Sequence, residues 1–129
     1  AAPCRLVVVA DHAALDRALS DVGASLGVTA AEQGQHAGEL ETSIVRELAP
    51  GGVRVDAVAR GTYAPTGDAQ RLFYPSLRAN APTGVVGDPR GFDPSRADAY
   101  LDAWSDVLVA LYRERIEALR AQTNGTQSP

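Results

Sequence analysis

A histidine and two glutamates stand within six residues in the stretch QGQHAGELETS, Gln33 to Ser43. Glycines flank His36, so a ligand can approach the backbone there closely. Glu39 and Glu41 open a predicted helix, where the helix dipole favours a carboxylate. Such residues suit metal-assisted hydrolysis, in which a divalent ion lowers the pKa of a bound water and a histidine transfers its proton.

The same stretch can also be interpreted as a solvated polar cluster on the surface of an acidic protein, with Thr42 and Ser43 as helix-capping groups. Two ligands do not make a metal site, because a catalytic metal normally has three or more protein ligands and an open position. The only other histidine, His12, stands at a predicted helix start, where we expect a structural or solvent-facing role. The residues alone leave both interpretations open.

A strand and a helix are predicted before this stretch. Arg5–Ala10 (RLVVVA) is a short valine-rich run, typical of a strand buried on both faces of a parallel sheet. Asp11 can cap a helix that weakens at Gly23 and ends at Gly27. The apolar residues of that helix form a single stripe: Leu15, Leu19, Val22 and Leu26.

After this helix, residues 28–38 are predicted to form a loop that leads into a short helix at Glu39–Leu48. Pro50 and two glycines stop that helix. Three valines that follow indicate a short strand or extended edge: Val53, Val55 and Val58.

The second half of the chain is predicted to hold a long structured loop and a long helix. Gly61–Asp93 is rich in proline and glycine, as in binding elements, lids or oligomer contacts. Asp93 is a predicted N-cap and Pro94 the first residue of a helix that runs to about Gln122. The apolar face of that helix comprises Leu101, Trp104, Leu108, Leu111 or Tyr112, Ile116 and Leu119.

The order of these elements predicts an α/β layer arrangement in one domain, residues 1–122, followed by a polar tail, residues 123–129. One strand cannot make a sheet. Either further strands lie within the predicted loops, or a partner segment completes the sheet.

Composition narrows the classes of function. The 129 residues carry 12 basic and 16 acidic side chains, a net charge of −4, without a basic stripe for nucleic acid or an anionic membrane. No apolar run approaches the roughly 18 residues of a membrane span, and no signal-peptide pattern occurs. A single cysteine, Cys4, excludes an internal disulfide. We expect a cytoplasmic protein that acts on a small molecule.

Two segments carry a resemblance to a known family. HAGELETS resembles the HAG-E-x-ETS signature of the creatininase family of metal-dependent amidohydrolases. GVVGDPRGFDPSRADAY, Gly84 to Tyr100, is similar to the GV-x-GDP segment that leads into the final helix of that family. Both occur in the family's order at a comparable separation, and together they span most of the chain.

The resemblance implies a three-layer α/β fold, of which this chain would supply the C-terminal part of a mostly parallel sheet plus helices. It also implies a homo-oligomer, commonly a hexamer, and a site that holds two divalent ions, zinc and/or manganese. His36 matches the proton-transfer residue and Glu41 a metal-ligand position. Glu39 matches a variable position on the substrate side, and Thr42 and Ser43 match positioning groups.

The chain also departs from the family pattern. Family members are longer, and their first half supplies a Glu-x-His-Gly-Pro-His segment, an aspartate and a Gly-His-Gly-Gly-Asn turn that hold the metals. None of these occurs here, and the chain contains no methionine. We therefore expect a fragment or split protein, whose N-terminal half or companion chain carries the Glu-x-His and Gly-His-Gly-Gly-Asn ligands.

Two functional hypotheses follow. The first is a metal-dependent hydrolase that cleaves a C–N bond in a small cyclic amide, a formamide or a peptide-like substrate, and is active only with that N-terminal half. The second is a non-catalytic subunit or interaction module that retains the family fold. Strict creatinine specificity is less favoured, because the aromatic residues nearest the site lie in the long loop: Tyr63, Phe73 and Tyr74.

Overall fold

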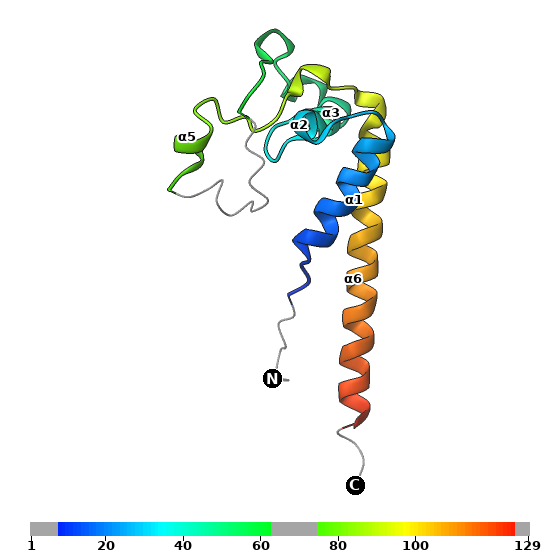
Figure 1. Ribbon diagram of the computed structural model, residues 1–129. Coiled ribbons are helices and arrows are strands. Elements are labelled where there is room, and N and C mark those ends of the chain that lie inside the picture. Colours follow the sequence, from blue (N-terminus) through cyan, green and yellow to red (C-terminus); the bar gives the residue numbers. More distant parts are fainter. Residues whose placement is uncertain (1–7, 63–74, 126–129) are drawn as a thin grey trace.

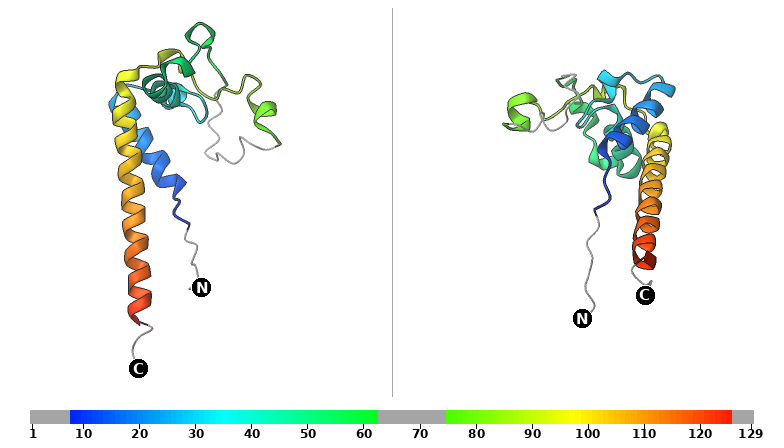
Figure 2. Two further views of the ribbon diagram at one scale, coloured as in Figure 1. Left: turned by 180° about the vertical axis from the view of Figure 1, so that it is seen from behind. Right: turned by 60° about the horizontal axis from the view of Figure 1, so that its bottom comes forward.

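The computed structural model describes residues 8–62 and 75–125 (Figure 1). Cys4, Tyr63, Phe73 and Tyr74 lie outside the described residues. Helices α1 (His12–Ser25) and α6 (Ala97–Gly125) pack side by side and antiparallel (Figures 1 and 2). The C-terminal turns of α6 extend beyond the start of α1.

Capping residues explain where α1 begins and ends. Asp11 Oδ1 accepts a hydrogen bond from the backbone N of Ala14 at 2.9 Å, which satisfies one free donor of the first turn. After the last turn, Gly27 has a φ of +76°, a conformation that glycine adopts without strain. The helix predicted from Asp11 is therefore confirmed.

The start of α6 is also set by a cap. Asp93 Oδ1 accepts from the backbone N of Ser95 at 3.0 Å, and the 3₁₀ turn η4 (Pro94–Arg96) continues directly into the helix. The predicted long helix is confirmed, and it continues to Gly125, past the predicted beginning of the tail. The division into one domain and a tail stays a prediction, and residues 126–129 lie outside the described residues.

Two shorter helices cross the end of this pair (Figure 1). The helix α3 (Glu39–Leu48) has the predicted bounds. The loop predicted before it contains α2 (Ala30–Gln33), a single turn closed by a capping box in which Thr29 and Glu32 exchange hydrogen bonds. Because Gln33 Nε2 donates to the carbonyl oxygen of Leu19 at 2.8 Å, α2 is fixed to α1.

The remaining described elements are short helical turns. The 3₁₀ turns η1 (Pro50–Gly52) and η2 (Val55–Ala57) follow α3, so the short strand predicted from Val53, Val55 and Val58 is wrong. A 3₁₀ bond from the backbone N of Ala57 to the carbonyl oxygen of Arg54, 2.9 Å, closes the chain into a turn there. Within the predicted long loop lie α5 (Leu77–Asn80) and η3 (Pro89–Gly91).

The expected mostly parallel sheet, and with it the three-layer α/β fold, is wrong: the described residues are helical and contain isolated bridges in place of strands. His36 pairs with Val86 in an antiparallel bridge, and Thr62 pairs with Val86 in a parallel one. Residues 5–7 of the predicted strand lie outside the described residues; residues 8–10 have no regular secondary structure and no bridge partner among the described residues, and Val8 is 71 % exposed. A valine-rich run becomes a strand only where a ladder partner satisfies its backbone.

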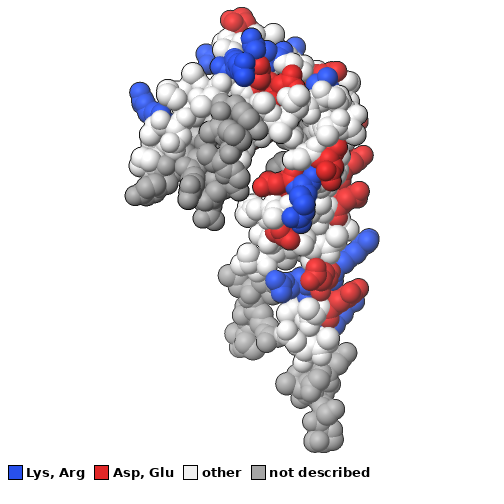
Figure 3. Space-filling model, in the orientation of Figure 1, with Lys and Arg blue, Asp and Glu red and all other residues white. Residues whose placement is uncertain are grey.

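The buried core is small, and within it Ala81 and Val86 form a cluster against which Leu77 packs. Its apolar members are Val28, Leu40, Ala81, Val86, Ala97 and Tyr100. Three residues of the predicted apolar face of α6 are instead exposed: Trp104, Tyr112 and Ile116. Acidic and basic side chains intermingle along the visible face of α6, so that face carries no one-sided basic patch (Figure 3).

Candidate functional site

Backbone hydrogen bonds join the loop that carries His36 to the Gly84–Tyr100 segment. The backbone N of Gln35 donates a hydrogen bond to the carbonyl oxygen of Val86 at 2.8 Å. The backbone N of Val86 donates in turn to the carbonyl oxygen of His36, also at 2.8 Å. Residues 61–62 bond to residues 85 and 87 on the other side. Two segments that are far apart in the sequence therefore meet at Val86, which is 1 % exposed.

Glycine makes this close approach possible. Gly34 has a φ of +69°, and a Cβ added there would lie 1.9 Å from the carbonyl oxygen of Val86. A Cβ at Gly38 would lie 2.0 Å from the carbonyl oxygen of Gln33. Real Cβ atoms do not approach backbone oxygens this closely, so packing requires glycine at both positions, and at Gly34 the positive φ requires it as well. Ala37, between them, is held at a φ of +52°.

Glu39 forms a buried polar cluster with three other side chains. Its Oε1 accepts from Arg96 Nη1 at 2.7 Å and from Ser43 Oγ at 3.0 Å, and its Oε2 accepts from Tyr100 Oη at 2.8 Å. Ser43 Oγ in turn accepts from the backbone N of Asp93 at 3.0 Å. This Glu39 cluster ties α3 to the start of α6.

The environment of the Glu39 cluster alters the acidity of its members. Glu39 and Tyr100 are 1 % and 0 % exposed. Burial, together with the hydrogen bond to the carboxylate, raises the pKa of Tyr100, so its hydroxyl remains a donor. The hydrogen bond to Glu39 raises the pKa of Arg96, so the guanidinium stays charged where it lies 2.7 Å from Glu39 Oε1.

A second ion pair lies in the GDPRG part of the other segment. Arg90 contacts both carboxylate oxygens of Asp88, with Nε–Oδ1 and Nη2–Oδ2 distances of 2.8 and 2.6 Å. The hydrogen bond from Arg90 lowers the pKa of Asp88 to about 2. The backbone N of Asp88 donates to the carbonyl oxygen of Glu32 at 3.0 Å, which links this segment to α2.

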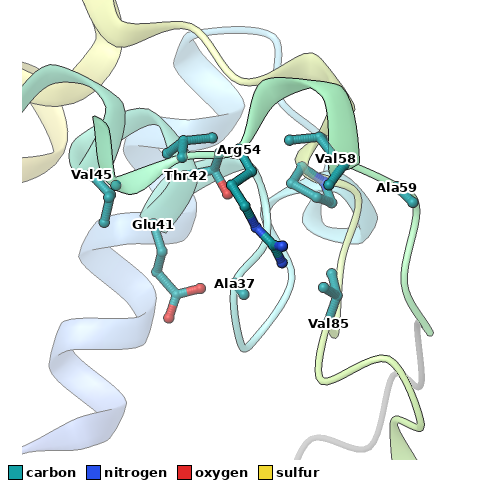
Figure 4. A pocket seen from close by; sticks show the side chains of 12 residues that line it. Ala37, Glu41, Thr42, Val45, Arg54, Val58, Ala59 and Val85 are labelled. Carbon is teal, nitrogen blue, oxygen red and sulfur yellow. The ribbon is translucent and has the colours of Figure 1, made fainter. Parts of the chain in front are cut away.

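An open cavity of about 340 Å³ lies beside the joined segments (Figure 4). Its charged lining residues are Glu41 and Arg54, and Thr42 adds a hydroxyl. Its walls are mostly apolar, from Val45, Val53, Val58, Val85 and Pro89. Both predicted segments contribute, the first through Ala37, Glu41 and Thr42 and the second through residues 85 and 89.

The structure separates the three predicted site residues. Glu41 faces the cavity, and its Oε2 accepts from the backbone N of Gly38 at 3.1 Å (Figure 4). His36 is partly exposed next to Ala37, outside the lining of that cavity. Glu39 points to the interior, where Ser43, one of the predicted positioning groups, contacts it. Glu41 and Glu39 thus leave α3 on different sides.

The described residues do not fit a metal centre by themselves. Over residues 8–62 and 75–125, no three His, Cys, Asp or Glu side chains come together as a metal site requires. Glu41 offers one carboxylate to the cavity. A bound metal would need further ligands from another segment.

Sequence reasoning did not identify Arg54, Arg96 or Tyr100. A helical-spacing signal was available for the Glu39 cluster, because Glu39 and Ser43 are four residues apart, as are Arg96 and Tyr100. Residues at that spacing share a helix face. No comparable signal exists for Arg54, which lies between two 3₁₀ turns.

The family model described as creatinine amidohydrolase matches residues 5–112. The chain therefore belongs to the creatininase family, which supports a hydrolase of the amidohydrolase type. Neither the curated proteins nor the solved structures provided a match. Within the described residues, every helix is too short or too polar to cross a membrane.

Proposed function

We propose that this chain contributes to a metal-dependent amidohydrolase that cleaves a C–N bond in a small cyclic amide, a formamide or a peptide-like substrate. The observation that carries the proposal is the meeting of the two family segments at the wall of a cavity that Glu41 faces. Zinc or manganese, two ions per site, would supply the Lewis acid. The ligands beyond Glu41 would come from an N-terminal half or companion chain with Glu-x-His and Gly-His-Gly-Gly-Asn segments.

Glu41 suits the role of a metal ligand. One of its oxygens is held by the backbone N of Gly38, which fixes the direction of the carboxylate. The side chain stands in the first turn of α3, whose backbone is held by hydrogen bonds of the helix. Its orientation toward the cavity would therefore be set before a metal binds.

His36 suits proton transfer. Its backbone N and O both bond to Val86, at 3.2 and 2.8 Å, so the position of its Cβ is fixed while the ring stays partly exposed. A histidine ring can accept and release a proton during turnover. For Glu39, the predicted substrate contact stays a prediction, and a substrate would have to displace Arg96, Ser43 or Tyr100 to reach it.

We also propose a homo-oligomer, in line with the hexamers of the family. The support is the exposed apolar side chains of α6, which are 37 % (Trp104), 54 % (Tyr112) and 46 % (Ile116) exposed. These side chains also favour the second candidate function, a non-catalytic subunit that binds a companion. A cytoplasmic location stays a prediction from the sequence.

The test is to purify the assembled protein and determine its polypeptide inventory by intact mass, its metal content and its hydrolysis of creatinine, N-formyl compounds and peptides. His36→Ala should lower kcat about 100-fold or more, as expected for loss of a proton-transfer group. Glu41→Gln should lower metal occupancy. The matched control is Glu47→Gln, on an exposed position of the same helix.

Unchanged turnover in the first variant and unchanged metal content in the second would contradict the enzyme proposal. A folded 129-residue monomer without metal or companion would contradict it as well. A companion that copurifies without metal or turnover would favour the non-catalytic subunit.

A further inference from the structure

Arg54 is the basic side chain that lines the cavity beside Glu41. It stands between η1 and η2. In η1 the backbone N of Gly52 donates to the carbonyl oxygen of Ala49 at 2.7 Å, and in η2 the backbone N of Ala57 donates to the carbonyl oxygen of Arg54 at 2.9 Å. These two turns fix the backbone on both sides. Figure 4 shows the Arg54 side chain reaching into the space between Glu41 and Val85.

The guanidinium of Arg54 is available to a ligand. Over the part of the chain that the structure describes, the ion pairs join Asp88 to Arg90, and both Glu39 and Asp93 to Arg96. Glu41, the nearest carboxylate in the cavity lining, is instead held by the backbone N of Gly38. Arg54 therefore brings a positive charge to the cavity that no described carboxylate neutralises within ion-pair distance.

The chemistry of this cavity favours one kind of ligand. A guanidinium presents a planar fork of donors that matches a carboxylate and forms two parallel charge-assisted hydrogen bonds. The apolar walls suit a short aliphatic or cyclic body. Glu41 repels a second negative group, so an acidic ligand has one favoured direction, with its carboxylate at Arg54 and its neutral end at Glu41.

We propose that Arg54 binds a free carboxylate of the substrate, so that the preferred substrates are small amides that carry such a group, for example an N-formyl or N-acyl amino acid. This inference rests on the proposed amidohydrolase function and narrows its substrate class. Neutral and cationic amides such as creatinine lack the group that Arg54 recognises. Arg54 is thus a specificity-determining residue, and Glu41 stays at the reacting end.

Binding of two matched probes tests this assignment on the full chain. N-formylglycine carries the carboxylate, and N-formylglycinamide replaces it with a neutral amide. NMR titration should show that N-formylglycine binds about tenfold more tightly or better, because a charge-assisted bidentate contact is lost in the amide. The preference should weaken as salt rises, since the cavity is open to solvent.

Variants assign the preference to Arg54. Arg54→Ala should bind both probes with equal, weak affinity, and Arg54→Lys should keep part of the preference because it retains charge without the fork. Arg113→Ala, on an exposed turn of α6 outside the cavity lining, is the matched control and should bind like the unmodified chain. Far-UV circular dichroism of each variant checks that the helices are intact.

Three results would overturn the assignment: equal affinities for the two probes, a preference that survives in Arg54→Ala, or no saturable binding of N-formylglycine. Failure of the amidohydrolase proposal gives a different result. A carboxylate preference in binding without turnover by the assembled protein would refute the hydrolase alone. Equal turnover of both probes would refute the role of Arg54 alone.

Discussion

Replacing Glu39 by alanine removes the acceptor at which three side chains converge. Tyr100 Oη, fully buried, would lose its partner, and an unsatisfied buried hydroxyl costs about 1–3 kcal/mol. Arg96 would lose less, because its side chain is 25 % exposed and Nη1 also donates to the carbonyl oxygen of Gly91 at 3.1 Å. Breaking a buried ion pair costs about 3–5 kcal/mol. The partial exposure of Arg96 places the expected loss near the lower end, about 3 kcal/mol.

Urea unfolding followed by far-UV circular dichroism measures this loss as a change in the free energy of unfolding. Glu47→Ala removes an exposed glutamate from the same helix and should change that free energy by less than about 0.5 kcal/mol. Tyr100→Phe deletes one of the bonds to Glu39 and should cost about 1 kcal/mol. The double variant of Glu39 and Tyr100 should cost less than the sum of the single ones, because the two share one interaction.

A loss below about 1 kcal/mol for Glu39→Ala would refute the reasoning, since it would mean that water already solvates the carboxylate. Additive costs in the double variant would refute the contact between Glu39 and Tyr100.

Two further predictions concern the joined segments. Gly34→Ala places a Cβ against the carbonyl oxygen of Val86 and should lower the free energy of unfolding by at least about 2 kcal/mol. Gly27→Ala is also at positive φ but in open space, so it should lower that free energy by only about 1 kcal/mol. Equal losses for the two variants in urea unfolding would contradict the packing argument. The pKa of Asp88 is lowered to about 2 from 3.8, so its pair with Arg90 stabilises the fold fully above the higher value and is lost as pH falls toward the lower one. Because Arg90 is 57 % exposed, Asp88→Asn should cost only about 0.5–1 kcal/mol at neutral pH. The cost should be much smaller near pH 2, where about half of the Asp88 carboxyl groups are protonated in the folded protein. A cost in urea unfolding that does not change with pH would refute this dependence of stability on the Asp88 charge.

The sequence predicted helices well because their signals are local. The cap at Asp11, the bounds of Glu39–Leu48 and the cap at Asp93 each depend on residues within one or two turns. The strand at Arg5–Ala10 and the edge at Val53–Val58 depend on partners elsewhere in the chain or outside it. Valine content gives no information about such partners, and the structure shows no regular structure at residues 8–10 and a 3₁₀ turn at Val55–Ala57 instead.

In the candidate site too, local features could be predicted from the sequence and features that depend on distant residues could not. The motif around His36 placed Glu41 on the first turn of α3, and that turn faces the cavity. The motif did not reveal that Glu39, two residues earlier, points to the interior. That orientation depends on Arg96 and Tyr100, which lie on a different helical segment. Arg54 lies between two 3₁₀ turns; the proline and glycines of the first predict a turn but do not reveal that the Arg54 side chain lines the cavity.

The sequence separation of the contacts at Glu39 and Ser43 has a consequence for the order of folding. The hydrogen bonds that join these two residues to Asp93, Arg96 and Tyr100 close loops of 50, 57 and 61 residues. Closing a loop of this length lowers the conformational entropy of the chain before the contact forms, whereas a helix such as α6 forms from neighbouring residues. We therefore expect the helices to form first and the cavity that Glu41 faces to appear only at the last, rate-limiting step of folding.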